Sequence, residues 1–191
     1  MNRRLLLLTG FLLLALVGGL WAAESSPQPL KSGPTVGQAT PMLPAIAVNG
    51  PYKGRKTCYT RAYKGAPTVY LFVRDATEQA AELVIRLDKL VQQHGKQGLK
   101  AVVVLLAGAE TKPLVSTWAQ QKGIQVPIAY PEKGRTDPAL KPWNINPQAA
   151  TTLVIARGGK VTFNLVNVRR EDEAKVAQAV QRVLAKAKSE R

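Results

Sequence analysis

Cys58 is the only cysteine in the chain, and it lies in a strongly basic segment. No acidic residue occurs between positions 53 and 64, and the basic ones there are Lys53, Arg55, Lys56, Arg61 and Lys64. A nearby positive charge favours the thiolate, which is the nucleophilic form of cysteine. The residue types therefore fit either a reactive thiol or a surface that binds an anionic partner.

The spacing of these residues weakens the case for a reactive thiol. In an extended strand successive side chains point to opposite faces, so Arg55 and Arg61 fall on the face of Tyr59. Only Lys56 shares the face of Cys58 at close spacing. We therefore predict a structural or incidental cysteine that is alkylated slowly in the folded protein and readily in denaturant. A catalytic Cys58 is the alternative.

The remaining candidates for site chemistry indicate no metal centre and no cofactor. His94 is the single histidine, and we expect it to be solvated at the end of a helix, just before Gly95. One histidine and one cysteine far apart in sequence do not make a set of metal ligands. Trp118 and Trp143 are expected to be core or rim aromatics rather than ligand platforms.

The N-terminus has the pattern of a secretory signal peptide over residues 1–23. Two arginines precede an apolar run over residues 5–20, and small residues follow it. The run is shorter than the roughly 20 residues of a membrane span, although an uncleaved anchor is the alternative. We therefore predict an exported protein, periplasmic or extracellular, that meets a membrane only through this segment.

Residues 24–41 are rich in Pro, Ser, Gly and Thr, which predicts a flexible linker ahead of a domain over residues 42–191. The chain carries 27 Lys+Arg against 12 Asp+Glu, a net charge of +15 that falls to +13 without Arg3 and Arg4. Export makes nucleic acid an unexpected partner. The charge serves solubility, or attraction to an anionic surface such as lipid or cell-wall polymer.

Buried strands alternate with helices along the domain. Continuous apolar runs predict strands, and apolar residues at helical spacing predict helices that begin at Asp75, Pro113 and near Glu171. The strand runs are TVYLFV (68–73), KAVVVLLAG (100–108) and VPIAY (126–130). Arg157-Gly158-Gly159 predicts a closing hairpin. The order indicates an α/β fold with a mixed central sheet, helices on its faces and an extra N-terminal β-hairpin arm that carries Cys58.

Three segments resemble the thioredoxin-like superfamily, in its peroxiredoxin and alkyl hydroperoxide reductase–thiol-specific antioxidant branch. They are VGQATPMLPAIAVNG (36–50), TVYLFVRD (68–75) and NPQAATTLVIARGGKVTFNLV (146–166), and the resemblance spans residues 36–185. It implies a thioredoxin-like fold and a redox site at the start of the helix that follows the central strand.

The residues at that implied site depart from the family pattern. No cysteine occurs where the resemblance places the working thiol, and Asp75 and Thr77 stand there instead. Ala150 occupies the place of the cis-proline before Thr-Thr. Because a cis bond before a non-proline residue costs about 2.5–4 kcal/mol, we expect the peptide bond between Ala149 and Ala150 to be trans. In related exported sequences the arm carries Cys-x-x-Cys, and here Arg61 stands in the second position.

The sequence therefore predicts an exported thioredoxin-like domain that lacks the usual dithiol. We expect a non-catalytic binding or scaffold module for a protein partner or an anionic surface, rather than an enzyme. The alternative is a thiol-dependent antioxidant or oxidoreductase of the peroxiredoxin kind, with Cys58 as its sole thiol.

Overall fold

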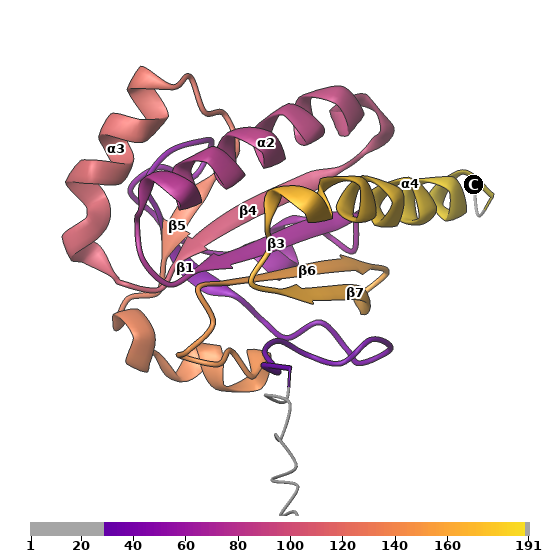
Figure 1. Ribbon diagram of the computed structural model, residues 1–191, viewed down its shortest axis with the longest axis horizontal. Coiled ribbons are helices and arrows are strands. Elements are labelled where there is room, and N and C mark those ends of the chain that lie inside the picture. The colour runs from indigo at the N-terminus through magenta and orange to yellow at the C-terminus, as the bar shows by residue number, and fades with distance from the viewer. Residues whose placement is uncertain (1–28, 190–191) are drawn as a thin grey trace, which may run out of the picture.

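The computed structural model describes residues 29–189, which fold around one seven-stranded mixed sheet (Figure 1). The predicted signal peptide over residues 1–23 lies outside the described residues. The strands are β1 (Pro44–Ala47), β2 (Lys56–Cys58), β3 (Thr68–Val73), β4 (Lys100–Leu105), β5 (Ile128–Tyr130), β6 (Thr151–Arg157) and β7 (Lys160–Val166). Their order in the sheet is β2-β1-β5-β4-β3-β6-β7.

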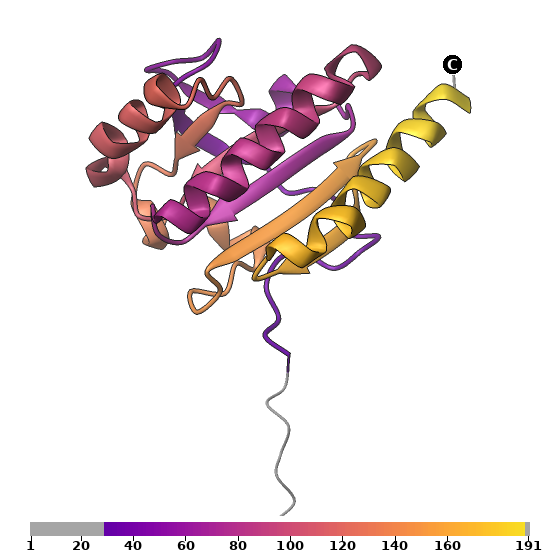
Figure 2. The same cartoon turned by 45° about the horizontal axis from the view of Figure 1, so that its top comes forward.

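Helices cover both faces of this sheet. The α-helices are α1 (Tyr59–Ala62), α2 (Glu78–His94), α3 (Lys112–Gln121) and α4 (Glu173–Ser189). The 3-10 turns are η1 (Gly95–Gln97), η2 (Ala109–Thr111), η3 (Gly134–Thr136), η4 (Pro138–Trp143) and η5 (Arg170–Asp172). Helices α2 and α4 lie side by side over one face (Figure 2), and α1 and η4 pack on the other. The predicted α/β class with a mixed central sheet is confirmed.

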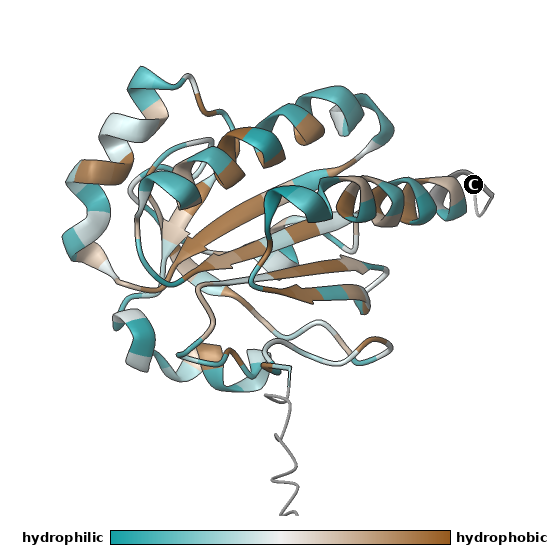
Figure 3. Ribbon diagram, in the orientation of Figure 1, coloured by the Kyte–Doolittle hydropathy of each residue, from teal (hydrophilic) through white to brown (hydrophobic). Residues whose placement is uncertain are grey.

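The centre of the sheet is apolar on both faces because β3 and β4 pair in parallel between covering helices. Every residue of β3 is buried, and Figure 3 shows the hydrophobic colour concentrated on the strands. Tyr70 and Phe72 point to the α1 and η4 side, where their ring centroids lie 5.0 and 4.9 Å from that of Trp143. Trp118 is buried in the core of the α2 side, so both tryptophans are core residues, as predicted.

Helix α2 begins three residues later than its sequence predicts. Thr77 is the N-cap, and its Oγ1 accepts a hydrogen bond of 3.2 Å from the N–H of Ala80. The predicted start at Asp75 is wrong because that carboxylate binds arginine side chains instead of the helix N-terminus. The helix ends at His94, directly before Gly95, as predicted. The chain continues through η1 and turns at Gly98, whose φ of 93° suits glycine.

The predicted β-hairpin arm is present as the antiparallel pair β1–β2. Strand alternation stops at Cys58, however, because α1 begins at Tyr59. Tyr59 is fully buried. The strand alternation that placed Arg61 on the face of Tyr59 is therefore wrong beyond Cys58.

The described part of the predicted linker is packed against the domain. Ser32 is buried, and its Oγ lies 2.6 Å from Thr152 Oγ1. Ala39 forms a β-bridge with Lys160 of β7. The prediction of a free linker is wrong for residues 31–41, because short polar side chains and backbone groups there bond to the β6–β7 hairpin. None of the described helices is long and apolar enough to cross a membrane.

Candidate functional site

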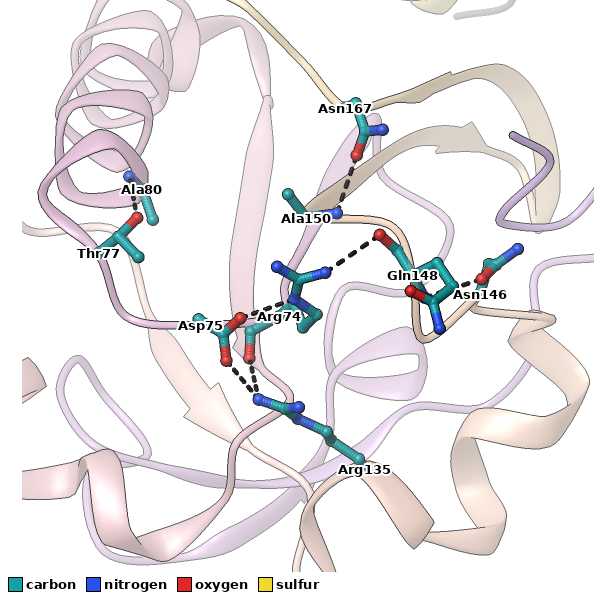
Figure 4. A network of polar contacts seen from close by, with 9 residues as sticks. All are labelled: Arg74, Asp75, Thr77, Ala80, Arg135, Asn146, Gln148, Ala150 and Asn167. Atoms are coloured by element: carbon teal, nitrogen blue, oxygen red, sulfur yellow. Dashed lines mark hydrogen bonds and ion pairs between the residues drawn. The ribbon is translucent and has the colours of Figure 1, made fainter. Parts of the chain in front are cut away.

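The turn that follows β3 holds a carboxylate between two arginines. The Nε of Arg74 donates to Asp75 Oδ2 at 2.6 Å, and Arg135 pairs with the other carboxylate oxygen (Figure 4). Arg135 also donates to the backbone oxygen of Arg74 at 3.3 Å. The hydrogen bond from Arg74, with the charge of Arg135, holds the pKa of the Asp75 carboxyl below its usual value. Asp75 thus places one negative charge between two arginines, which leaves this turn with a net positive charge.

The loop before β6 faces that turn and is bonded to it. The backbone N–H of Arg74 donates to Ala150 O at 2.9 Å, and its Nη1 donates to Gln148 O at 3.1 Å. The described residues contain no cis peptide bond, so the predicted trans bond between Ala149 and Ala150 is confirmed. Arg74 therefore joins β3 to this loop through both its backbone and its side chain.

Every backbone N–H of this loop from Asn146 to Ala150 already has an acceptor. Asn146 donates to Ser32 Oγ, and its own side-chain and backbone oxygens accept from Gln148 and Ala149. Ala150 donates to Asn167 Oδ1 at 2.8 Å (Figure 4). The loop can therefore donate no backbone hydrogen bond to a ligand without breaking one of its own.

A cleft of about 310 Å³ opens where this loop meets the start of α2. Its lining comes from the turn, the first turns of α2, the start of β6 with the residue before it, and the residues after β7: Arg74, Asp75, Thr77, Gln79, Ala80, Leu83, Ala150, Thr151, Asn167, Val168 and Arg169. Guanidinium groups and the N-terminus of α2 favour an anion here. The lining includes no thiol.

Cys58 lies elsewhere, on the edge strand β2. Strands β1, β5 and β4 separate β2 from β3 in the sheet, and the Cys58 thiol is only partly exposed. The structure therefore brings Asp75, Thr77 and Ala150 together and leaves Cys58 apart from them.

The basic residues around Cys58 do not converge on its sulfur. The Nζ of Lys56 pairs with Glu132 at 2.5 Å, and this hydrogen bond raises the pKa of Lys56. The guanidinium of Arg55 lies 5.8 Å from the ring centroid of Tyr52 and donates to Pro51 O. The other three, Lys53, Arg61 and Lys64, are exposed. The nearest predicted cation is thus already paired.

His94 is half-buried, and no described group lies within hydrogen-bonding distance of its buried Nδ1. The prediction of a solvated histidine is therefore wrong, because η1 continues past the end of α2. Among residues 29–189 no group of three or more His, Cys, Asp or Glu side chains is placed to hold a metal ion.

Sequence reasoning missed Arg135, which binds Asp75, and two residues that line the cleft, Asn167 and Arg169. Arg135 comes from a loop 60 residues after Asp75, so only the fold brings the two together. Asn167 has a φ of 52°, a left-handed conformation that asparagine tolerates better than most residues. An asparagine directly after the strand run of β7 was the one available signal.

No protein-family model and no curated protein sequence matches the chain. Solved structures do match. The thiol:disulfide interchange protein, thioredoxin family protein, from Chlorobium tepidum TLS is 16% identical, with a TM-score of 0.61 over 79% of this chain and 99% of that one. Peroxiredoxin Q from Xanthomonas campestris is 15% identical, with a TM-score of 0.58 over 74% of this chain and 91% of that one.

Both neighbours cover most of the described domain at low identity, so what they establish is the fold. The chain has a thioredoxin-like fold. The cleft at the start of α2 therefore occupies the place where the sequence resemblance puts the redox site.

Proposed function

We propose that this protein is an exported, thioredoxin-like binding module that does not catalyse thiol–disulfide exchange. The observation that carries the proposal is the separation of the only thiol from the cleft at the start of α2. Disulfide exchange within one chain needs a second thiol to resolve the mixed disulfide, and the 191 residues contain one cysteine.

The turn itself supports a role other than thiol chemistry. Asp75 fills the space between Arg74 and Arg135 with a fixed negative charge, which would oppose a thiolate at the same place. The loop over residues 146–150 uses its N–H groups internally. Binding at this cleft therefore relies on side chains and the N-terminus of α2 rather than on that loop, with the guanidinium groups as the natural contacts for an anionic group of a partner.

Export is part of the proposal and rests on the apolar run over residues 5–20 and the basic residues before it. The exposed basic residues of the arm suit an anionic surface as a second, weaker contact. That contact would lose strength as salt shortens the screening length from roughly 10 Å at 0.1 M to 3 Å at 1 M.

The test is catalytic activity of the purified protein and of its Cys58→Ser variant. We expect both to reduce insulin disulfides in the presence of dithiothreitol no faster than dithiothreitol alone, and to consume hydrogen peroxide at the same slow rate. Turnover that disappears in Cys58→Ser would instead establish the alternative, a thiol-dependent oxidoreductase or peroxidase.

A further inference from the structure

An apolar groove of about 190 Å³ runs between α2 and α4, the two helices that lie side by side in Figure 2. Its floor is aliphatic and buried, and consists of Leu87, Leu153 and Val176. Its walls are aliphatic and partly exposed, and consist of Leu83, Leu90, Val168 and Ala177. Such a surface gains free energy by covering its exposed carbon with another apolar group.

The rim of the groove is mainly cationic. It carries Arg86, Lys89 and Arg169 against one acid, Glu173. Arg86 pairs with Glu82 at 3.2 Å. In the described part of the chain no carboxylate lies within 4.0 Å of the Lys89 or Arg169 charged groups. An apolar channel beside two unpaired cations complements a ligand with an apolar tail and a negative head.

One end of the groove opens into the cleft at the start of α2, because Leu83, Val168 and Arg169 line both. The two hollows, about 190 and 310 Å³, together reach the range of roughly 300–1,000 Å³ that is typical of small-molecule sites. The first N–H groups of an α-helix have no partner within the helix. The N-terminus of α2 at this junction therefore adds to the attraction for an anionic head.

We propose that the groove binds a medium-chain fatty acid, with its carboxylate near Arg169 at the junction and its alkyl tail between α2 and α4. Leu83 and Gln93 are ten residues apart on α2, or about 15 Å at 1.5 Å per residue. This is the length of groove available to the alkyl tail. An extended peptide fits less well, because an aliphatic channel would leave its buried backbone groups without hydrogen bonds. The inference rests on the proposed role as a binding module and names its ligand class.

The experiment is calorimetric titration of the full chain with dodecanoate below its micelle concentration. We expect saturable binding of one dodecanoate per chain, weaker binding of dodecanol, and none of dodecyltrimethylammonium. Arg169→Gln should weaken dodecanoate binding about two- to fivefold, the value of a partly exposed ion pair. The matched control Arg170→Gln removes the neighbouring exposed arginine, which lines neither hollow, and should leave the affinity unchanged.

Two further measurements place the ligand. Ala177→Trp fills the groove and should abolish binding, and amide chemical-shift changes in the unmodified protein should gather on α2 and α4. Absence of saturable binding, or binding that ignores both Arg169→Gln and the head group, would overturn the inference. Shift changes confined to other elements would also overturn it. Failure of the proposed function looks different: insulin or peroxide turnover that depends on Cys58, whatever the result with dodecanoate.

Discussion

The turn after β3 has electrostatic surroundings that would activate a thiol but contains no cysteine, whereas the β1–β2 arm contains the cysteine without those surroundings. The turn places two arginines and the N-terminus of a 17-residue helix around one position, but that position holds Asp75. The arm holds Cys58, but its nearest predicted cation pairs with Glu132. A reactive cysteine needs the thiol and its electrostatic surroundings at the same point. Here the fold keeps the surroundings at one place and the thiol at another.

The largest effect should come from moving the thiol to the turn. We define the reactivity ratio as the alkylation rate of the folded protein divided by that in denaturant, both at pH 7. Asp75→Cys in a Cys58→Ser background should have a ratio well above one, because each unit by which the cations lower a thiol pKa raises the thiolate fraction about tenfold. The measurement is iodoacetamide labelling followed by intact mass.

The matched control is Lys96→Cys in the same background, an exposed position just after α2. The helix dipole disfavours a thiolate at that end, so this ratio should not exceed one. Equal ratios at the two positions would mean that the turn provides no special surroundings for a thiol.

The arm should depend on buried packing at Tyr59, directly after Cys58. Tyr59 is fully buried, so Tyr59→Ala should cost about 3–5 kcal/mol of unfolding free energy. Its hydroxyl has no hydrogen-bond partner among the described residues. Tyr59→Phe, the matched control, should therefore leave stability unchanged or raise it. Urea unfolding measures both, and a large loss in Tyr59→Phe would reveal a hidden partner for the hydroxyl.

The turn should contribute modestly to stability, and in a pH-dependent way. Because the pKa of Asp75 is lowered in the folded state, its contribution is present above its usual value near 3.8 and is lost as pH falls below it. The pairs are partly exposed, so Asp75→Asn should cost about 0.5–1 kcal/mol at neutral pH. Thermal unfolding should show the unmodified protein and Asp75→Asn converging as pH falls below 3.8.

Glu78→Gln serves as the control, because its carboxylate is largely exposed and lies 3.7 Å from Lys122. It should cost less stability at neutral pH than Asp75→Asn, because its one ion pair is longer and its carboxylate is more exposed. A neutral-pH loss in Asp75→Asn that persists undiminished at low pH would assign the effect to packing and not to the charge.

The smallest effect should be that of Lys56→Gln on the thiol. The Lys56 ammonium is bound by Glu132, so removing it should leave the reactivity ratio of Cys58 within about twofold of its value in the unmodified protein. A larger fall in the ratio would show that Lys56 acts on the sulfur after all.

The sequence predicted the fold well where the signal was local. The run over 68–73 became β3 with the same bounds, because a continuous β-branched and aromatic stretch strongly favours a buried strand. The hairpin between β6 and β7 formed because its tight turn needs positive φ at two positions, and Gly158 and Gly159 supply it. The linker was mispredicted because the bonds of Ser32 to Thr152 and Asn146 span more than a hundred residues.

The candidate site was predicted only in part. Asp75, Thr77 and Ala150 were recognised as departures from a family pattern, and they do line one cleft. Nothing near Asp75 in sequence indicated that Arg135 would bind it. The predicted helix start at Asp75 failed because its carboxylate pairs with two guanidinium groups, and Thr77 caps the helix instead.

The most direct measurement is the reactivity ratio of Cys58 in the unmodified chain. A thiol that is partly buried and unassisted by a cation is alkylated more slowly when folded than when unfolded. We therefore expect a ratio below one at pH 7. A ratio above one would mean that the fold activates Cys58, and would contradict the separation of the thiol from its electrostatic surroundings.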